Sequence, residues 1–191
     1  MDKRDKILNA ALKLFVEYGF HGTPTSKIAS EAGVSNGTLF HYFKTKDDLV
    51  LALYDSVKSE LNDYLHIAVD SIIDVEEKAK TLIAQTTHWA MANPQKFYYI
   101  QQIYFSPFAE QVPLEKTQKY MQLHVDLIEN GQKAGFLKLL PMNFVVSIVS
   151  NHIFGIYQYL QHNPNENSQD IIDKGIDMIW DMITVWFFYK K

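Results

Sequence analysis

The sequence has no cysteine, and it lacks several short motifs on which common enzyme classes depend. Without cysteine there is no disulfide, no thiolate ligand for a metal and no cysteine nucleophile. The phosphate-binding patterns GxGxxG and GxxxxGK and the zinc-binding pattern HExxH are also missing. We therefore expect no catalytic residues, no cofactor and no enzyme.

Histidines are too scattered to indicate a metal site. His88, His124 and His152 fall on three different predicted helices, and none of them has the HxxxH spacing that brings two imidazoles to one face of a helix. Ordinary core or surface histidines explain them, so we expect no bound metal.

Long uninterrupted apolar runs are missing as well. The most apolar stretch, residues 171–189, contains Asp173, Lys174, Asp177 and Asp181, which makes it a poor membrane span. The charged start of the chain does not resemble a secretory signal. We expect a cytoplasmic protein without a membrane partner.

Proline and glycine are few, with six and eight residues, and most separate segments of helical periodicity. Apolar residues three and four apart predict a helix over 7–18, in which Tyr18 completes the buried stripe and Gly19 ends it. Two short helices lie on either side of Gly33. Further helices are expected over 47–69, 74–92, 95–105, 114–134, 142–161 and 168–188. No segment alternates with a period of two, so the predicted fold class is all-α.

Several of these helices have recognisable first residues. Thr23 is predicted to cap a helix that begins at Pro24, and Ser35 is predicted to cap the next one. Thr45, with Asp48 three residues later, forms the acidic variant of a capping box.

The last two predicted helices are apolar over more than one face. A helix of a small protein that is apolar on two faces must bury both, and a second subunit is the usual cover. We therefore predict a homodimer in which these two helices of each chain form a four-helix contact.

Charge is distributed unevenly, although the net charge is only −4. Residues 1–46 contain seven Lys and Arg and four Asp and Glu, a balance of +3, which leaves −7 for residues 47–191. A basic segment on an acidic chain is a hint of nucleic-acid contact.

Residues 23–46, TPTSKIASEAGVSNGTLFHYFKTK, have the spacing of a helix-turn-helix. In such a unit the second helix enters the major groove of DNA, and here that helix offers short or planar polar groups that can reach phosphates or base edges. Asn36 is the best candidate base reader because a side-chain amide pairs bidentately with adenine. Gly37 allows close backbone approach. The other candidates on this helix are Ser35, Thr38 and His41.

The run AGVSNGTLFHYFKTKDDLV, preceded by EYGFHGT and KIAS, resembles the N-terminal domain of the TetR family of transcriptional regulators. This resemblance implies an all-α dimer with a three-helix helix-turn-helix domain at residues 1–46 and a helical ligand-binding and dimerisation domain at residues 47–191. It also implies a DNA operator and a small-molecule effector as partners. By the same resemblance, Thr25, Ser26, Tyr42 and Lys46 are phosphate contacts, and Phe40 packs near a thymine methyl or a sugar. Many similar sequences have Lys or Arg where Asn36 stands, so backbone affinity is expected to come from lysines outside the recognition helix.

An aromatic-rich stretch over residues 87–108 is the candidate for one wall of an effector pocket. Tyr and Trp combine apolar rings with polar tips, which suits a pocket for an apolar or aromatic molecule, although an aromatic core explains the same residues. The predicted lining is Trp89, Tyr98, Tyr104 and Phe105, completed by Tyr120, His124, Phe144, His152 and Tyr157.

The sequence thus predicts a ligand-responsive transcriptional regulator, with repression the favoured sign. Two alternatives stay open: an architectural or partner-recruiting DNA-bound protein of the same fold without an effector, and an enzyme that kept a DNA-binding domain, which the missing motifs disfavour.

Overall fold

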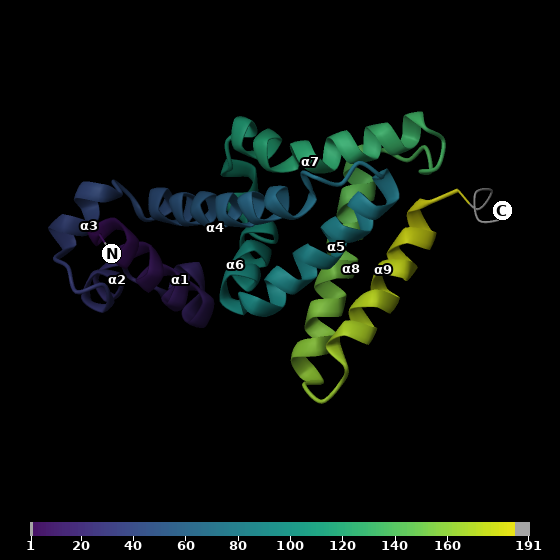
Figure 1. The fold of residues 1–191 in the computed structure, drawn as a ribbon. Coiled ribbons are helices and arrows are strands. Elements are labelled where there is room, and N and C mark those ends of the chain that lie inside the picture. The colour runs from purple at the N-terminus through teal and green to yellow at the C-terminus, as the bar shows by residue number, and fades with distance from the viewer. Residues whose placement is uncertain (1, 186–191) are drawn as a thin grey trace. The chain divides into compact units, whose positions relative to one another are not determined.

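The computed structural model describes residues 2–185, and within this range the chain is almost entirely helical (Figure 1). Apart from one isolated antiparallel bridge between Leu137 and Thr184, this range contains no β-structure, which confirms the all-α prediction. The described elements are α1 (Lys3–Gly22), α2 (Thr25–Glu31), α3 (Asn36–Tyr42), α4 (Lys46–Val69), α5 (Val75–Ala92), α6 (Pro94–Tyr104), the 3-10 helix η1 (Pro107–Gln111), α7 (Leu114–Lys133), α8 (Met142–His162) and α9 (Ser168–Ile183).

The chain divides into two compact units that are not contiguous in sequence. Unit 1 comprises residues 1–60 and 93–117, and unit 2 comprises residues 61–92 and 118–191. Unit 1 therefore contains α1–α3, the first part of α4, α6, η1 and the beginning of α7. The boundary at residue 46 expected from the sequence stays a prediction.

The core of unit 1 follows the apolar stripes of the sequence. Ile28 and Ala29 on α2, Leu39 on α3 and Phe43 after it are buried, as the helical spacing predicts. Tyr18 is an exception, because it is 46% exposed instead of completing the buried stripe of α1. Its ring lies under the ammonium of Lys27, 3.4 Å from the ring centroid, which keeps the side chain at the surface.

The end of α1 depends on Gly19 and Thr23. Gly19 has φ +72°, a left-handed conformation that strains other residues, and it breaks the regular helix three residues before its last residue. The predicted cap by Thr23 is wrong: α2 begins at Thr25, and its capping residue, Pro24, has no side-chain cap. The buried Thr23 hydroxyl instead lies 2.8 Å from the Gly19 carbonyl and 3.1 Å from the Leu14 carbonyl, so it satisfies the end of α1.

Unit 2 is built on α5, α8 and α9, which pack against one another. Ile172, Ile176, Ile179 and Trp180 give α9 its buried side. Gly175 lies so close to Ile156 on α8 that a Cβ atom at position 175 would overlap the Ile156 side chain. Figure 1 shows α8 and α9 side by side.

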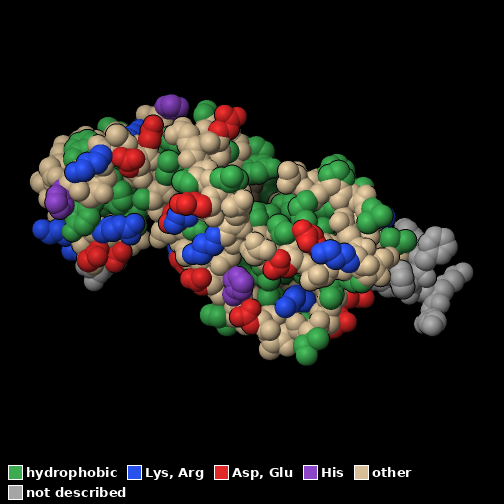
Figure 2. All heavy atoms as spheres, turned by 90° about the horizontal axis from the view of Figure 1, so that it is seen from above, with side chains coloured by type: hydrophobic (Ala, Val, Ile, Leu, Met, Phe, Trp, Pro, Cys, Tyr) green, Lys and Arg blue, Asp and Glu red, His purple; other side chains and the backbone are tan. Residues whose placement is uncertain are grey.

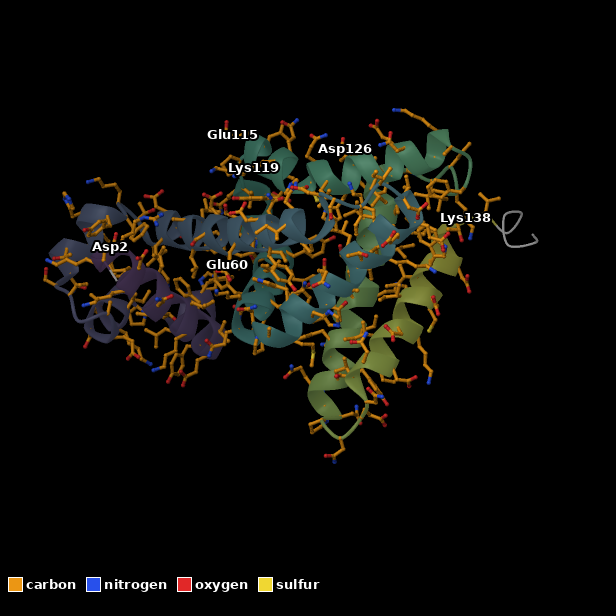
Figure 3. The ribbon with its side chains drawn as sticks, viewed as in Figure 1. Asp2, Glu60, Glu115, Lys119, Asp126 and Lys138 are labelled. Atoms are coloured by element: carbon orange, nitrogen blue, oxygen red, sulfur yellow. The ribbon has the colours of Figure 1, made fainter. Side chains whose placement is uncertain are left out.

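The last described helix is shorter than the sequence predicted. α9 ends at Ile183 rather than at residue 188, and residues 186–188 lie outside the described range. The chain leaves the helix because it pairs with the segment after α7: Lys138 N–H donates to the Ile183 carbonyl, and Val185 N–H donates to the Phe136 carbonyl, each at 2.9 Å. Lys138 also donates from Nζ to the Met182 carbonyl, beside the end of α9 in Figure 3.

Among residues 2–185, no helix combines the length and the apolarity that a membrane crossing requires.

Candidate nucleic-acid interface

The turn between α2 and α3 is fixed by local hydrogen bonds. Gly33 has φ +65°, and Val34 N–H returns to the Ala29 carbonyl at 2.9 Å. Ser35 then caps α3, with its Oγ accepting from Thr38 N–H at 3.1 Å, as predicted. Residues 33–37 also match the GxSxG spacing of serine hydrolases, but here the serine lies between two helices and not on a strand-to-helix turn, so no nucleophile is indicated.

The helix after α3 begins as the sequence predicts. Asp48 N–H donates to Thr45 Oγ1, and Thr45 N–H donates to Asp48 Oδ2, both at 3.0 Å. This reciprocal capping box fixes the first turn of α4 and places Lys46 as its first residue.

The predicted DNA-contacting residues lie on α2, at the cap and along α3, and at the start of α4, and most of them are exposed. Leu39 and Phe43 turn inward, while the Asn36 side chain makes no hydrogen bond to the described residues and is free to bind a partner. Phe40 is 41% exposed, a large apolar surface for a short helix. The exposed members are Ser26, Ser35, Asn36, Gly37, Phe40, His41 and Tyr42, and the half-buried ones are Thr25, Thr38 and Lys46.

Lys and Arg side chains lie on the part of unit 1 that holds the helix-turn-helix, with Asp and Glu side chains among them (Figure 2). Two of them are placed by aromatic rings: Lys27 by Tyr18, as described above, and Arg4, whose guanidinium lies 5.7 Å from the centroid of Phe43. These two placements could not be predicted from the sequence, because each joins residues of different segments that share no periodic stripe.

An ion pair joins α1 to α2. Lys13 Nζ lies 2.6 Å from Glu31 Oε1, and this hydrogen bond raises the pKa of Lys13 and lowers the pKa of Glu31. Both groups are exposed, so the pair contributes little to stability. The pair occupies Lys13, one of the seven Lys and Arg of residues 1–46, and leaves the other six for contact with a polyanion.

The residues predicted to line an effector pocket are distributed over both units. Tyr98, Tyr104 and Phe105 belong to unit 1 and are exposed. In unit 2, Phe144 and His152 are exposed on α8, His124 is half-buried on α7, and three aromatic residues are buried: Trp89, Tyr120 and Tyr157. Their common role in a pocket stays a prediction.

Two hollows of unit 2 are lined by other residues. One, of about 280 Å³, lies between the start of α5 and the end of α9 and includes Phe136 and Trp180. The other, of about 330 Å³, lies between α5 and α9 and includes Lys80, Asp173 and Asp177. None of the nine predicted pocket residues lines either hollow.

Several known proteins resemble this chain over part or all of its length. A crystal structure of a tetR family transcription regulator from Shewanella sp. PV-4 superposes with a TM-score of 0.88 and 33% identity, over 97% of this chain and 100% of that one. A fatty acid metabolism regulator protein of Bacillus subtilis (strain 168) is 35% identical over 74 residues, which are 39% of this chain and 35% of the relative. The HTH-type transcriptional regulator UidR of Escherichia coli (strain K12) is 31% identical over 105 residues, which are 48% of this chain and 54% of the relative. The alignments thus span about a third to a half of these curated relatives.

Two family models together cover nearly all of the described range. Residues 7–53 match the model for bacterial regulatory proteins of the tetR family, and residues 54–185 match the model for the tetracyclin repressor-like C-terminal domain. The second match alone covers more than half of the chain. The chain therefore belongs to the TetR family of bacterial regulatory proteins.

Proposed function

We propose that this protein is a DNA-binding transcriptional repressor that a small, largely apolar or aromatic molecule releases from its operator. The observation that carries the proposal is the exposed polar side of α3, held by the Ser35 cap and the Gly33 turn. It belongs to residues 1–46, in which seven Lys and Arg outnumber four Asp and Glu. In a helix-turn-helix, such a helix lies in the major groove with its first residues at the base edges.

Within this proposal the side chains divide by role. Asn36 and His41 read base edges, and Phe40 contacts a thymine methyl or a sugar. Thr25, Ser26, Tyr42 and Lys46 contact phosphates, which fix the register without reading sequence. Because α3 contains no Lys or Arg, phosphate neutralisation depends on cations of other segments, such as Lys46.

The protein acts as a homodimer in this proposal. Each of the two last described helices leaves large apolar side chains at the surface of the single chain: Phe144 on α8 is 50% exposed and Met178 on α9 is 67% exposed. A second copy that covers these helices brings two recognition helices to successive major grooves, about 34–36 Å apart, on a near-palindromic operator.

The effector acts by preferring one arrangement of the dimer. A molecule that binds the DNA-incompetent arrangement better than the competent one lowers operator affinity, and a coupling of about 1–3 kcal/mol corresponds to a 5- to 150-fold loss. The aromatic residues of unit 2 favour an apolar or aromatic effector.

Selection of duplexes from a random-sequence library tests the DNA-binding part of the proposal. The expected result is a near-palindrome with half-sites one helical turn apart, bound by the dimer at nanomolar concentration in moderate salt. Recovery of no consensus sequence would contradict sequence-specific regulation.

A thermal-shift screen against apolar and aromatic compounds tests the effector part. We expect a compound that raises the melting temperature and releases the selected duplex, and a reporter with that duplex across its promoter should be derepressed by it. A bound compound that leaves the duplex affinity unchanged would favour the architectural alternative.

A further inference from the structure

One hollow of unit 2 lies apart from the predicted effector pocket. It has a volume of about 280 Å³, and none of the nine predicted pocket residues lines it. Residues from three places in the sequence form its wall: Asp74, Val75 and Glu76 at the start of α5, Phe136 after α7, and Trp180 and Thr184 near the end of α9.

Backbone pairing holds one side of this hollow in place. Val185 N–H donates to the Phe136 carbonyl, and Lys138 N–H donates to the Ile183 carbonyl, each at 2.9 Å. Figure 3 shows Lys138 beside the end of α9. The rings of Phe136 and Trp180 lie with centroids 6.2 Å apart and planes tilted by 34°. The two aromatic rings of the wall are therefore positioned by the pairing of the segments that carry them.

The Trp180 indole brings an unused hydrogen-bond donor to this wall. The side chain is 2% exposed, and its Nε1 is buried and has no hydrogen-bond partner among residues 2–185. An indole N–H can only donate, so the partner that it lacks is an acceptor. A buried donor without a partner is unfavourable, and an acceptor bound in the hollow removes this penalty.

Other polar groups of the wall already have partners. Thr184 Oγ1 donates to the Trp180 carbonyl at 2.9 Å, and Asp74 Oδ1 caps α5 by accepting a backbone N–H at 2.8 Å. Glu76 Oε1 lies 3.1 Å from Lys80 Nζ, and the same ammonium lies 5.6 Å from the centroid of the Trp180 ring. Among these groups, the indole N–H is the one left for a ligand.

Charge on the wall limits the class of ligand. The charged residues named in the wall, Asp74 and Glu76, are both acidic, so a carboxylate or phosphate on the ligand is repelled. The aromatic rings of Phe136 and Trp180 suit a flat, apolar body. The wall thus favours an aromatic molecule that is neutral and offers an acceptor.

We propose that this hollow is a binding site for a small aromatic molecule that has a hydrogen-bond acceptor and no negative charge. The acceptor binds the Trp180 N–H, and the ring of the ligand packs against Phe136. The volume is at the lower end of the usual range for ligand pockets, which begins at roughly 300 Å³, so one or two fused rings fit. This site is separate from the effector pocket of the proposed function, and binding to it is measured without DNA.

The probe is quinoline, which has two fused rings, an acceptor nitrogen and no charge at neutral pH. Nitrogen–proton correlation spectra of the full-length protein resolve the indole N–H groups, and the Trp180 signal is the one missing from Trp180→Phe. In wild type, quinoline should shift this signal downfield as the hydrogen bond forms. The backbone signals of residues 134–137 report affinity in every variant, and Trp180→Phe should bind quinoline roughly fivefold more weakly than wild type.

Ala134→Phe tests the location of the site without removing the indole. Ala134 is exposed and lines the hollow, so a phenyl group at this position should fill the hollow and abolish the quinoline-induced shift of the Trp180 signal. Ala92→Phe is the matched control, because it is the same substitution at an exposed residue at the other end of α5, and it should keep the wild-type affinity. Melting temperatures report folding, and if Trp180→Phe does not fold, Ala134→Phe and its control decide.

A charged probe tests the role of the acidic residues. Quinoline-6-carboxylate should bind wild type roughly two- to fivefold more weakly than quinoline. Asp74→Asn, which retains a capping side chain at the start of α5, should reduce this difference.

Three outcomes would overturn the proposal: no quinoline-induced shift of the Trp180 N–H signal in wild type, equal quinoline affinity in wild type and Ala134→Phe, or equal affinity in wild type and a folded Trp180→Phe. Failure of the protein to select a DNA duplex would refute the proposed function and leave this test unchanged.

Discussion

The two units differ in how the sequence specifies them. In unit 1, the two helices of seven residues, α2 and α3, are flanked by turns whose residues have individual roles. Gly33 is in the left-handed region, Ser35 is a cap, and Thr45 with Asp48 forms a capping box. Unit 2 depends on long helices with broad apolar faces, such as α8 and α9. Single residues therefore determine the local structure of unit 1, whereas whole helix faces determine the packing of unit 2.

The exposed surfaces of the two units also differ in chemical character. α3 exposes polar groups such as Asn36 and His41, whereas α8 and α9 expose apolar ones such as Phe144 and Met178. Polar side chains suit base edges and phosphates, and an apolar face suits another protein surface. Under the proposed function, unit 1 contacts nucleic acid and unit 2 associates with a second copy, and each part can be tested.

The largest effect is expected from a charge on the apolar face of unit 2. Met178→Asp would place a carboxylate in the proposed dimer contact, so sedimentation should show a monomer, and duplex affinity should fall more than about a hundredfold because the two half-sites are no longer bound by one molecule. Ile67→Asp is the control, since Ile67 is 83% exposed in unit 2 but lies on α4. A Met178→Asp dimer with wild-type affinity would contradict the assignment.

A smaller but more selective effect is expected from the recognition helix. Asn36→Ala should cost about 1–3 kcal/mol at one base pair of each half-site and leave the other positions unchanged. Repeating the library selection with the variant measures this, because the consensus should lose its preference at that position alone. An unchanged consensus would remove Asn36 from base recognition.

The sequence was sufficient for features that depend on neighbouring residues. Ser35 with Thr38 and Thr45 with Asp48 are pairs three residues apart, and both caps form as predicted. The buried stripe of Ile28, Leu39 and Phe43 follows from helical spacing. Helix positions and the exposed polar side of α3 could therefore be predicted without a structure.

Two predictions failed because a segment bonds to a different element from the one expected. Thr23 bonds to carbonyls four and nine residues earlier instead of capping α2, and α9 ends at Ile183 because of pairing with Lys138. The predicted pocket lining stays a prediction, and its members differ in burial: Tyr98 is exposed in unit 1, while Trp89 is buried in unit 2.

A substitution at Gly37 tests close approach of DNA without a loss of fold stability in unit 1. A Cβ at position 37 would meet only Ser35 Oγ at 3.7 Å, an ordinary contact, so Gly37→Ala should keep or raise the melting temperature. If the DNA backbone approaches this residue, affinity for the selected duplex should fall roughly tenfold, a change of about 1.4 kcal/mol.

Gly33→Ala is the converse variant. A Cβ at position 33 would have no neighbour within 4 Å, but Gly33 has a φ of +65°. The substitution should therefore cost about 1–2 kcal/mol of stability, measured by chemical denaturation. If the Gly37→Ala variant of the preceding paragraph keeps the full duplex affinity, DNA does not approach α3 at Gly37.

The smallest expected change distinguishes a phosphate contact from a base contact. Lys46→Ala should weaken binding to specific and random duplexes alike, by a few-fold, and should reduce the slope of log affinity against log salt by about one per subunit, since each phosphate contact contributes about 0.9. Lys174→Ala is the matched control from unit 2, because Lys174 is paired with Asp170 at 2.7 Å on α9. The Lys174 variant should keep the wild-type slope. Equal slopes for both variants would mean that Lys46 does not contact a phosphate. Other cations of residues 1–46, such as Lys44 and Lys27, would then have to supply the affinity for the DNA backbone.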